Sequence, residues 1–195
     1  FRICKPIFHF LADKNIISSI SVNHEQVLDK YRREATSFTE SKGFFSFITF
    51  VKLGFFQSEK FFDENIVKEL KIKNKYLEEA DEFLNFIPEN SNKIFIHIRR
   101  GDYKDYTVYA KNALLPMSYF KEQIDWFIQN RENYFFIFLS NEPEFIEKEF
   151  NFIENKIVSH ANHYGVDLAI MTKCNSAILS PSSFGWWGSY LMKNR

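Results

Sequence analysis

From residue 94 onward, short apolar runs alternate with segments of helical periodicity. Four runs rich in β-branched and aromatic residues predict buried strands at 94–98, 134–140, 156–160 and 177–180. Apolar residues at helical spacing predict helices near 118–130, 141–150, 167–172 and 182–191. Strands that alternate with helices form a parallel sheet covered by helices on both faces. The sequence therefore predicts an α/β fold with a doubly wound parallel sheet.

The first part of the chain gives weaker signals. Residues 3–11 and 44–56 are interpreted as short strands or turns. An apolar stripe at helical spacing, with one break, predicts helix over about 61–86. The length of 195 residues is compatible with one domain or two small ones.

Composition narrows the class of protein. Lys plus Arg equals Asp plus Glu at 25 each, so no overall basic charge favours nucleic acid as a partner. The sequence has no apolar run of about 18 residues that would predict a membrane span. Cys4 and Cys174 form neither a CxxC motif nor a metal-ligand cluster, which argues against a zinc site. The chain begins at Phe1 without an initiator methionine, so we expect a fragment.

Polar residues follow three of the predicted strands at the point where each strand ends. They are His97, Arg99, Arg100 and Asp102 after the first strand, Ser140 and Asn141 after the second, and Ser182 and Ser183 after the fourth. The carboxyl ends of parallel strands share one edge of the sheet, where ligands bind. Guanidinium groups match phosphate oxygens in geometry. The pattern predicts a site for a phosphorylated small molecule.

Each of these residues also has a structural alternative. Adjacent arginines are often a solvated pair, and His97 is equally consistent with a structural histidine. Ser182 and Ser183 stand where a helix N-terminus would bind phosphate, or they only cap that helix. Asp167, at the start of another helix, caps it or accepts hydrogen bonds from a nucleoside. Asp102 is either a general base or the salt-bridge partner of an arginine, and the second role is favoured.

Several segments together resemble glycosyltransferase family 11, the α-1,2-fucosyltransferases (galactoside 2-alpha-L-fucosyltransferases). They are GFFQSEKFF at 54–62, HIRRGDY at 97–103, LPMSYF at 115–120, DLAIMTKCNSAIL at 167–179 and SPSSFGWWGSYL at 180–191. The family's glycine-rich N-terminal segment, of the type GLGNQMFQ, is absent. Pro181 and Gly185 stand where many bacterial members have Asn and Ser. The resemblance covers about 54–191.

The resemblance implies a two-lobed fold of the GT-B type, with a partial N-terminal acceptor-side lobe over 1–90 and a GDP-fucose-binding, Rossmann-like domain over 91–195. It implies transfer of L-fucose from GDP-fucose to the 2-OH of a terminal β-galactoside, with inversion and without a metal or other cofactor. Three residues are then expected to be catalytic: Arg99, Arg100 and Asp102. The residues expected to bind the donor are His97, Arg99, Arg100, Ser140, Asn141, Asp167, Ser182, Ser183 and Phe184.

Other functions remain open at this point. A fucosyltransferase of another linkage (α-1,6) and a truncated, non-catalytic GDP-sugar-binding protein fit most of the same residues. A phosphatase or phosphomutase would use His97 as its nucleophile. The expected partners are GDP-fucose and a galactose-terminated glycan, with peripheral membrane association for lipid-linked acceptors and no nucleic acid. The expected location is cytoplasmic for a bacterial chain, or the Golgi for a eukaryotic chain whose membrane anchor is missing.

Overall fold

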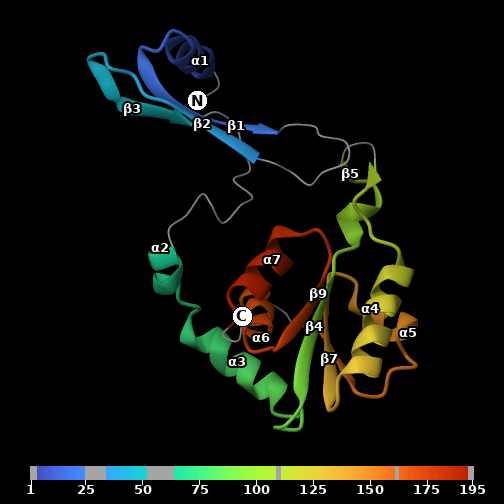
Figure 1. Ribbon diagram of the computed structural model, residues 1–195. Helices are drawn as coiled ribbons and strands as arrows, with labels where there is room; N and C mark the ends of the chain where they lie inside the picture. Colours follow the sequence, from blue (N-terminus) through green and yellow to red (C-terminus); the bar gives the residue numbers. More distant parts are fainter. Residues whose placement is uncertain (1–3, 25–33, 52–63, 109–110, 161–162, 193–195) are drawn as a thin grey trace. The chain divides into compact units, whose positions relative to one another are not determined.

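The computed structural model describes residues 4–24, 34–51, 64–108, 111–160 and 163–192 (Figure 1). The chain forms two compact units, Phe1–Leu70 and Lys71–Arg195. None of the helices in the described segments is both long and apolar enough to span a membrane.

The second unit is built on a four-stranded parallel sheet. Its strands are β4 (Asn92–Ile98), β7 (Tyr134–Ser140), β8 (Lys156–Ser159) and β9 (Ser176–Leu179), in the order β8-β7-β4-β9. In the register, Ile98 of β4 lies opposite Ser140, and His97 lies opposite Leu179. The four strands predicted from the sequence are confirmed, each within two residues at either end.

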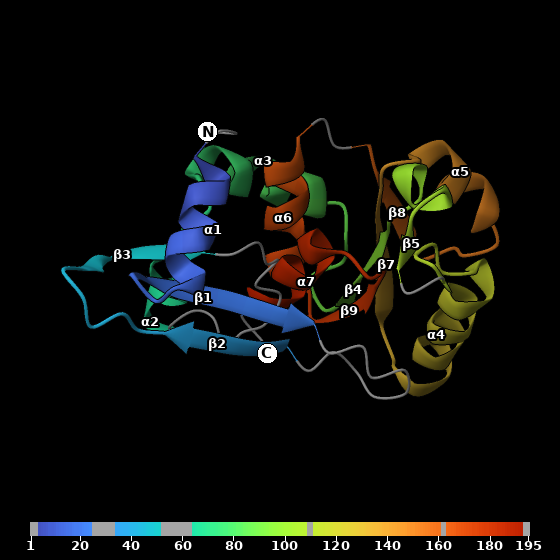
Figure 2. The same cartoon turned by 90° about the horizontal axis from the view of Figure 1, so that it is seen from above.

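Helices cover both faces of this sheet (Figures 1 and 2). Helices α4 (Met117–Asn130) and α5 (Pro143–Glu149) lie on one face; α3 (Asn74–Leu84), α6 (Tyr164–Thr172) and α7 (Ser183–Tyr190) lie on the other. Each face has its own buried apolar cluster. The prediction of a doubly wound α/β unit is therefore confirmed.

The side chains of β4 alternate between the two clusters. Ile94, Ile96 and Ile98 belong to the α4/α5 cluster, whereas Phe95 belongs to the cluster formed with α3 and α6. His97 lies on the same face as Phe95, against the start of α7. This alternation follows from the two-residue period of a strand.

The strand order places a topological switch point between β4 and β9. From β4 the chain runs to β7 and then β8 through α4 and α5, and it returns through α6 to β9 on the other side of β4. In open α/β sheets, ligands bind beyond the carboxyl ends of the strands at such a point. After β4 comes a short 3-10 helix, η2 (Gly101–Lys104), and then the small hairpin of β5 (Thr107–Val108) and β6 (Lys111–Asn112).

The first unit contains helix α1 (Lys5–Asp13), a three-stranded sheet and helix α2 (Glu64–Glu69). Strand β1 (Ile17–His24) pairs antiparallel with β2 (Glu34–Thr39) and parallel with β3 (Phe45–Val51). The interpretation of 3–11 as strand or turn was wrong over α1, where a proline at the helix start supplies a favourable φ angle.

Two other N-terminal predictions need qualification. Of the strand or turn predicted over 44–56, the part after Val51 lies outside the described residues, as does most of the segment 54–62 that resembles the family. The helix predicted over 61–86 is two helices, α2 and α3, and residues 61–63 are not described. Helix α3 packs on α6 and belongs to the second unit, although the sequence analysis placed it with the N-terminal lobe.

Candidate functional site

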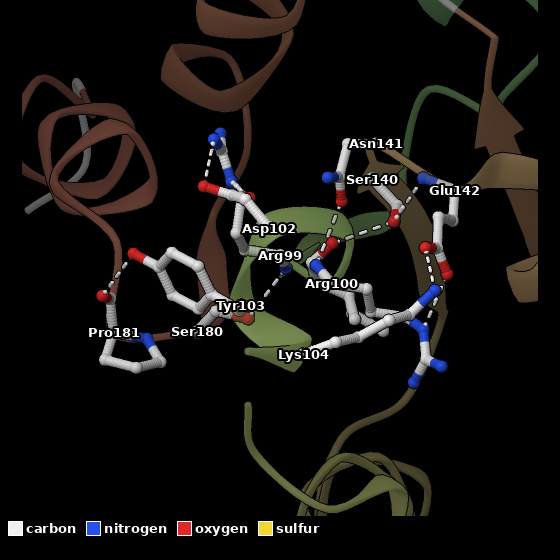
Figure 3. Close-up of polar contacts among 11 residues, drawn as sticks. Arg99, Arg100, Asp102, Tyr103, Lys104, Ser140, Asn141, Glu142, Ser180 and Pro181 are labelled. Atoms are coloured by element: carbon white, nitrogen blue, oxygen red, sulfur yellow. Dashed lines mark hydrogen bonds and ion pairs between the residues drawn. The ribbon is translucent and has the colours of Figure 1, made fainter. Parts of the chain in front are cut away.

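The carboxyl ends of β4 and β9 are joined by hydrogen bonds across the switch point. The backbone N–H of Arg99 donates to Ser180 Oγ at 2.9 Å, and the N–H of Ser180 donates to the carbonyl of His97 at 2.9 Å. The Tyr103 hydroxyl donates to the Pro181 carbonyl at 3.0 Å (Figure 3). Arg99 is therefore held next to the loop that begins α7.

The end of β7 holds the same turn from the other side. The backbone N–H of Arg100 donates to Asn141 Oδ1 at 2.9 Å, and Ser140 Oγ donates to the Ile98 carbonyl at 2.8 Å. Gly101 has φ +20°, and a Cβ there would collide with Asn141 Nδ2, so glycine permits this close approach. Ser140 and Asn141 thus shape the β4 exit, and their predicted contact with a nucleoside stays a prediction.

The two arginines, predicted to share one ligand, point in different directions (Figure 3). Arg99 makes two hydrogen bonds to Asp102, from Nε at 2.9 Å and from Nη2 at 3.1 Å. Arg100 instead bonds Glu142 Oε2 through Nε at 2.9 Å and lies 3.7 Å from the ring centre of Phe145. The Arg99 side chain is 38% exposed and that of Arg100 only 14%. Arg99 is therefore the more accessible of the two arginines.

Asp102 has the salt-bridge geometry that the sequence analysis favoured for it. Its hydrogen bonds with Arg99 lower the pKa of the carboxyl and raise the pKa of the guanidinium. Glu142 accepts from Lys104 and from Arg100, and these bonds lower its pKa as well. A carboxylate stabilised in its charged form is a weaker base, so neither side chain has the elevated pKa that suits a general base.

Helix α7 begins at the switch point with its N-terminus at the edge that holds Arg99. Trp186 N–H donates to the Ser182 carbonyl at 3.0 Å, and the N–H groups of residues 183–185 precede this first turn of bonding. Ser182 is the N-cap residue, but its side chain makes no capping hydrogen bond within the described chain. The capping interpretation of Ser182 is therefore wrong, and its hydroxyl is available to a ligand.

His97 is buried beneath this helix start. Its side chain is 5% exposed, its ring lies 5.7 Å from that of Phe184, and a Cβ on Gly185 would come within 2.8 Å of its Nδ1. Among the described residues, Nδ1 has no hydrogen-bond partner. Burial, and secondly the charge of Arg99, lowers the pKa of His97 to about 4, so the ring is neutral at pH 7.

Asp167 lies in the first turn of α6, near the end of β8. Its Oδ1 accepts a hydrogen bond from Ser159 Oγ at 2.8 Å. Burial raises its pKa to about 6, although the bond from Ser159 acts in the opposite direction. Asp167 is thus at the same sheet edge as the other predicted residues, and its contact with a nucleoside stays a prediction.

The sequence analysis missed three residues of this edge: Lys104, Glu142 and Ser180. Glu142 lies two residues after the end of β7 and Ser180 directly follows β9, so the position of both beside predicted strand ends was a usable signal. The residues that they contact are distant in sequence, so these contacts could not be predicted from the sequence. In the described segments no group of three or more His, Cys, Asp or Glu side chains could hold a metal ion.

The second unit is therefore a doubly wound α/β domain with cationic and amide groups at its switch point, a class that binds ligands at this edge. The chain belongs to glycosyl transferase family 11, whose family model matches residues 1–195.

Curated relatives support this membership at low identity. The chain is 24% identical to galactoside alpha-(1,2)-fucosyltransferase 2 of Sus scrofa, over 98% of the chain and 56% of the relative. It is 22% identical to galactoside 2-alpha-L-fucosyltransferase SEC1 of Bos taurus, over 98% and 52%. It is 31% identical to the O-antigen biosynthesis glycosyltransferase WbnK of Escherichia coli, over 54% and 36%. The chain spans about half the length of the curated relatives it matches, or less.

Among solved structures, NodZ alpha-1,6-fucosyltransferase co-crystallised with GDP is similar with a TM-score of 0.47 and 10% identity. The match covers 69% of this chain and 47% of that one.

Proposed function

We propose that the chain belongs to an inverting fucosyltransferase that moves L-fucose from GDP-fucose to the 2-OH of a terminal β-galactoside. Membership of family 11 and the relatives named galactoside alpha-(1,2)-fucosyltransferase support this proposal. The observation that carries it is the hydrogen bond across the switch point from the Arg99 backbone N–H to Ser180 Oγ, which places Arg99 beside the loop that leads into α7. Together these groups form a site suited to a diphosphate.

The proposed mechanism relies on stabilising the leaving group. The bond between the anomeric carbon of fucose and the phosphate oxygen breaks, and its electron pair leaves with GDP. The acceptor 2-hydroxyl oxygen forms the new bond on the opposite face, and its proton is released to solvent. Arg99, the N–H groups at the start of α7 and the Ser182 hydroxyl would stabilise the charge that develops on GDP, without a metal. Losing one such donor costs about 3 to 4 kcal/mol of barrier.

Linkage analysis of the product tests this proposal. Labelled GDP-fucose and lactose should yield fucose attached to the 2-OH of galactose, and Arg99→Ala should reduce transfer by at least a hundredfold. Arg131→Ala is the matched control, because this exposed arginine precedes β7 at the opposite edge of the sheet. An α-1,6 product, or equal activity of Arg99→Ala and Arg131→Ala, would contradict the proposal.

A GDP-sugar-binding role without transfer is the second candidate, since the chain spans only about half of its relatives. Calorimetric binding of GDP with no labelled product would favour it. The phosphatase alternative needs an accessible nucleophile, whereas His97 is buried beneath α7. Release of inorganic phosphate from simple monoesters would be required to revive that alternative.

A further inference from the structure

Three charged side chains meet on the β7 side of the β4 exit (Figure 3). Glu142 lies between Arg100, whose Nε donates to Oε2 at 2.9 Å, and Lys104, whose Nζ pairs with Oε1. The Arg100 guanidinium also covers the ring of Phe145, with 3.7 Å between its Cζ and the ring centre. Both carboxylate oxygens of Glu142 and one face of Arg100 are therefore already occupied.

Within this cluster the Arg100–Glu142 pair is more enclosed than the ion pair of the neighbouring arginine, whereas Lys104 is 48% exposed. The side chains of Arg100 and Glu142 are 14% and 24% exposed, whereas those of Arg99 and Asp102 are 38% and 58% exposed. The backbone N–H of Glu142 donates to Ser140 Oγ at 3.1 Å, which fixes the start of the segment that bears the carboxylate. Enclosed ion pairs with additional hydrogen bonds hold their geometry better than exposed ones do.

The cluster connects the turn that follows β4 with the start of α5. Arg100 directly precedes the short helix η2 and Lys104 is its last residue, whereas Glu142 is the N-cap residue of α5 and Phe145 lies in its first turn. Without the Glu142 charge, two cations would face each other across this turn with no counter-ion. Because Arg99 directly precedes Arg100, a shift of this turn would also move the Arg99 backbone, whose N–H donates to Ser180 Oγ.

We propose that Arg100 is a positioning residue. Its ion pair with Glu142 fixes the turn after β4, so that Arg99 can bind the donor diphosphate. This inference rests on the proposed function. It assigns donor binding to Arg99 and positioning of the turn to Arg100. In the alternative, Arg100 itself contacts the donor, either through its Nη groups or after its Nε leaves Glu142.

The sign of the change in GDP affinity separates the two roles. If Arg100 only positions the turn, Glu142→Gln should weaken GDP binding about tenfold in calorimetry and lower kcat/KM for GDP-fucose. If Arg100 contacts the donor, removing the competing carboxylate frees two cations, and GDP binding should stay equal or become tighter. Glu149→Gln is the matched control, because Glu149 is also on α5, pairs with Lys121 and is 28% exposed. It should leave GDP affinity unchanged.

Arg100→Lys provides a second test that does not depend on the Glu142 variant folding. Lysine keeps the charge but lacks the planar fork that bonds Glu142 while lying over Phe145. The positioning role predicts a loss of GDP affinity close to that of Glu142→Gln, with little further loss in the double variant. Near-normal GDP affinity of Arg100→Lys, or equal or tighter binding by Glu142→Gln, would overturn the inference alone. Failure of the unaltered chain to bind GDP would overturn the proposed function and this inference together.

Discussion

The stability of the second unit should depend on pH through two buried groups that act in opposite directions. Burial lowers the pKa of His97 from 6.5 to about 4 and raises the pKa of Asp167 from 3.8 to about 6. The folded state therefore binds fewer protons than the unfolded state at His97 and more at Asp167. Each group changes the free energy of unfolding by about 3 kcal/mol, at roughly 1.4 kcal/mol for each pH unit of difference.

The signs follow from linkage. The stability associated with neutral His97 is present above pH 6.5 and is lost as the pH falls to about 4. The stability associated with protonated Asp167 is present below pH 3.8 and is lost as the pH rises to about 6. Between pH 4 and pH 6 the two contributions should nearly cancel in the unaltered chain.

Single variants should reveal each contribution separately. In Asp167→Asn, the free energy of unfolding should rise by about 3 kcal/mol from pH 4 to pH 6.5 relative to the unaltered chain. In His97→Gln it should fall by a similar amount from pH 4 to pH 6. The double variant is the control and should follow the profile of the unaltered chain, since both contributions are removed.

Urea unfolding followed by tryptophan fluorescence would measure these changes. All three tryptophans, Trp126, Trp186 and Trp187, belong to the second unit, so their signal reports on the unit that contains both groups. The test uses the slope with pH, which does not depend on the absolute stability of each variant. Equal slopes in the two single variants, or slopes of the same sign, would refute the argument from burial.

Two further predictions concern the turns on either side of the switch point. Replacing both Ser182 and Ser183 by Ala should weaken GDP binding but change the free energy of unfolding by less than about 0.5 kcal/mol, because the Ser182 side chain makes no capping bond within the described chain; unchanged calorimetric affinity would argue against a ligand role. Gly101→Ala should destabilise the second unit by about 1 to 3 kcal/mol in urea unfolding, because its φ is +20° and the added Cβ would meet Asn141. A stability equal to that of the unaltered chain would show that the turn adapts without strain.

The elements of the second unit could be predicted because their signals are local. The apolar run at 134–140 became β7 without a change of boundary, and the stripe at 118–130 became α4 with one added residue. The first unit was predicted less well. Residues 5–13 carry a mixed apolar pattern that does not separate strand from helix, and the structure places α1 there.

The order of strands and helices, the polar residues at the strand ends and the family resemblance were all present in the sequence by itself, because periodicity and motifs are properties of neighbouring residues. Only the tertiary structure decided that Arg99 and Arg100 diverge, and that Glu142 holds one of them. Arg99 is hydrogen-bonded to a residue 81 positions away, and Arg100 to one 42 positions away. Contacts at such separations depend on how the strands are ordered in the sheet, and this order is set by packing over the whole unit.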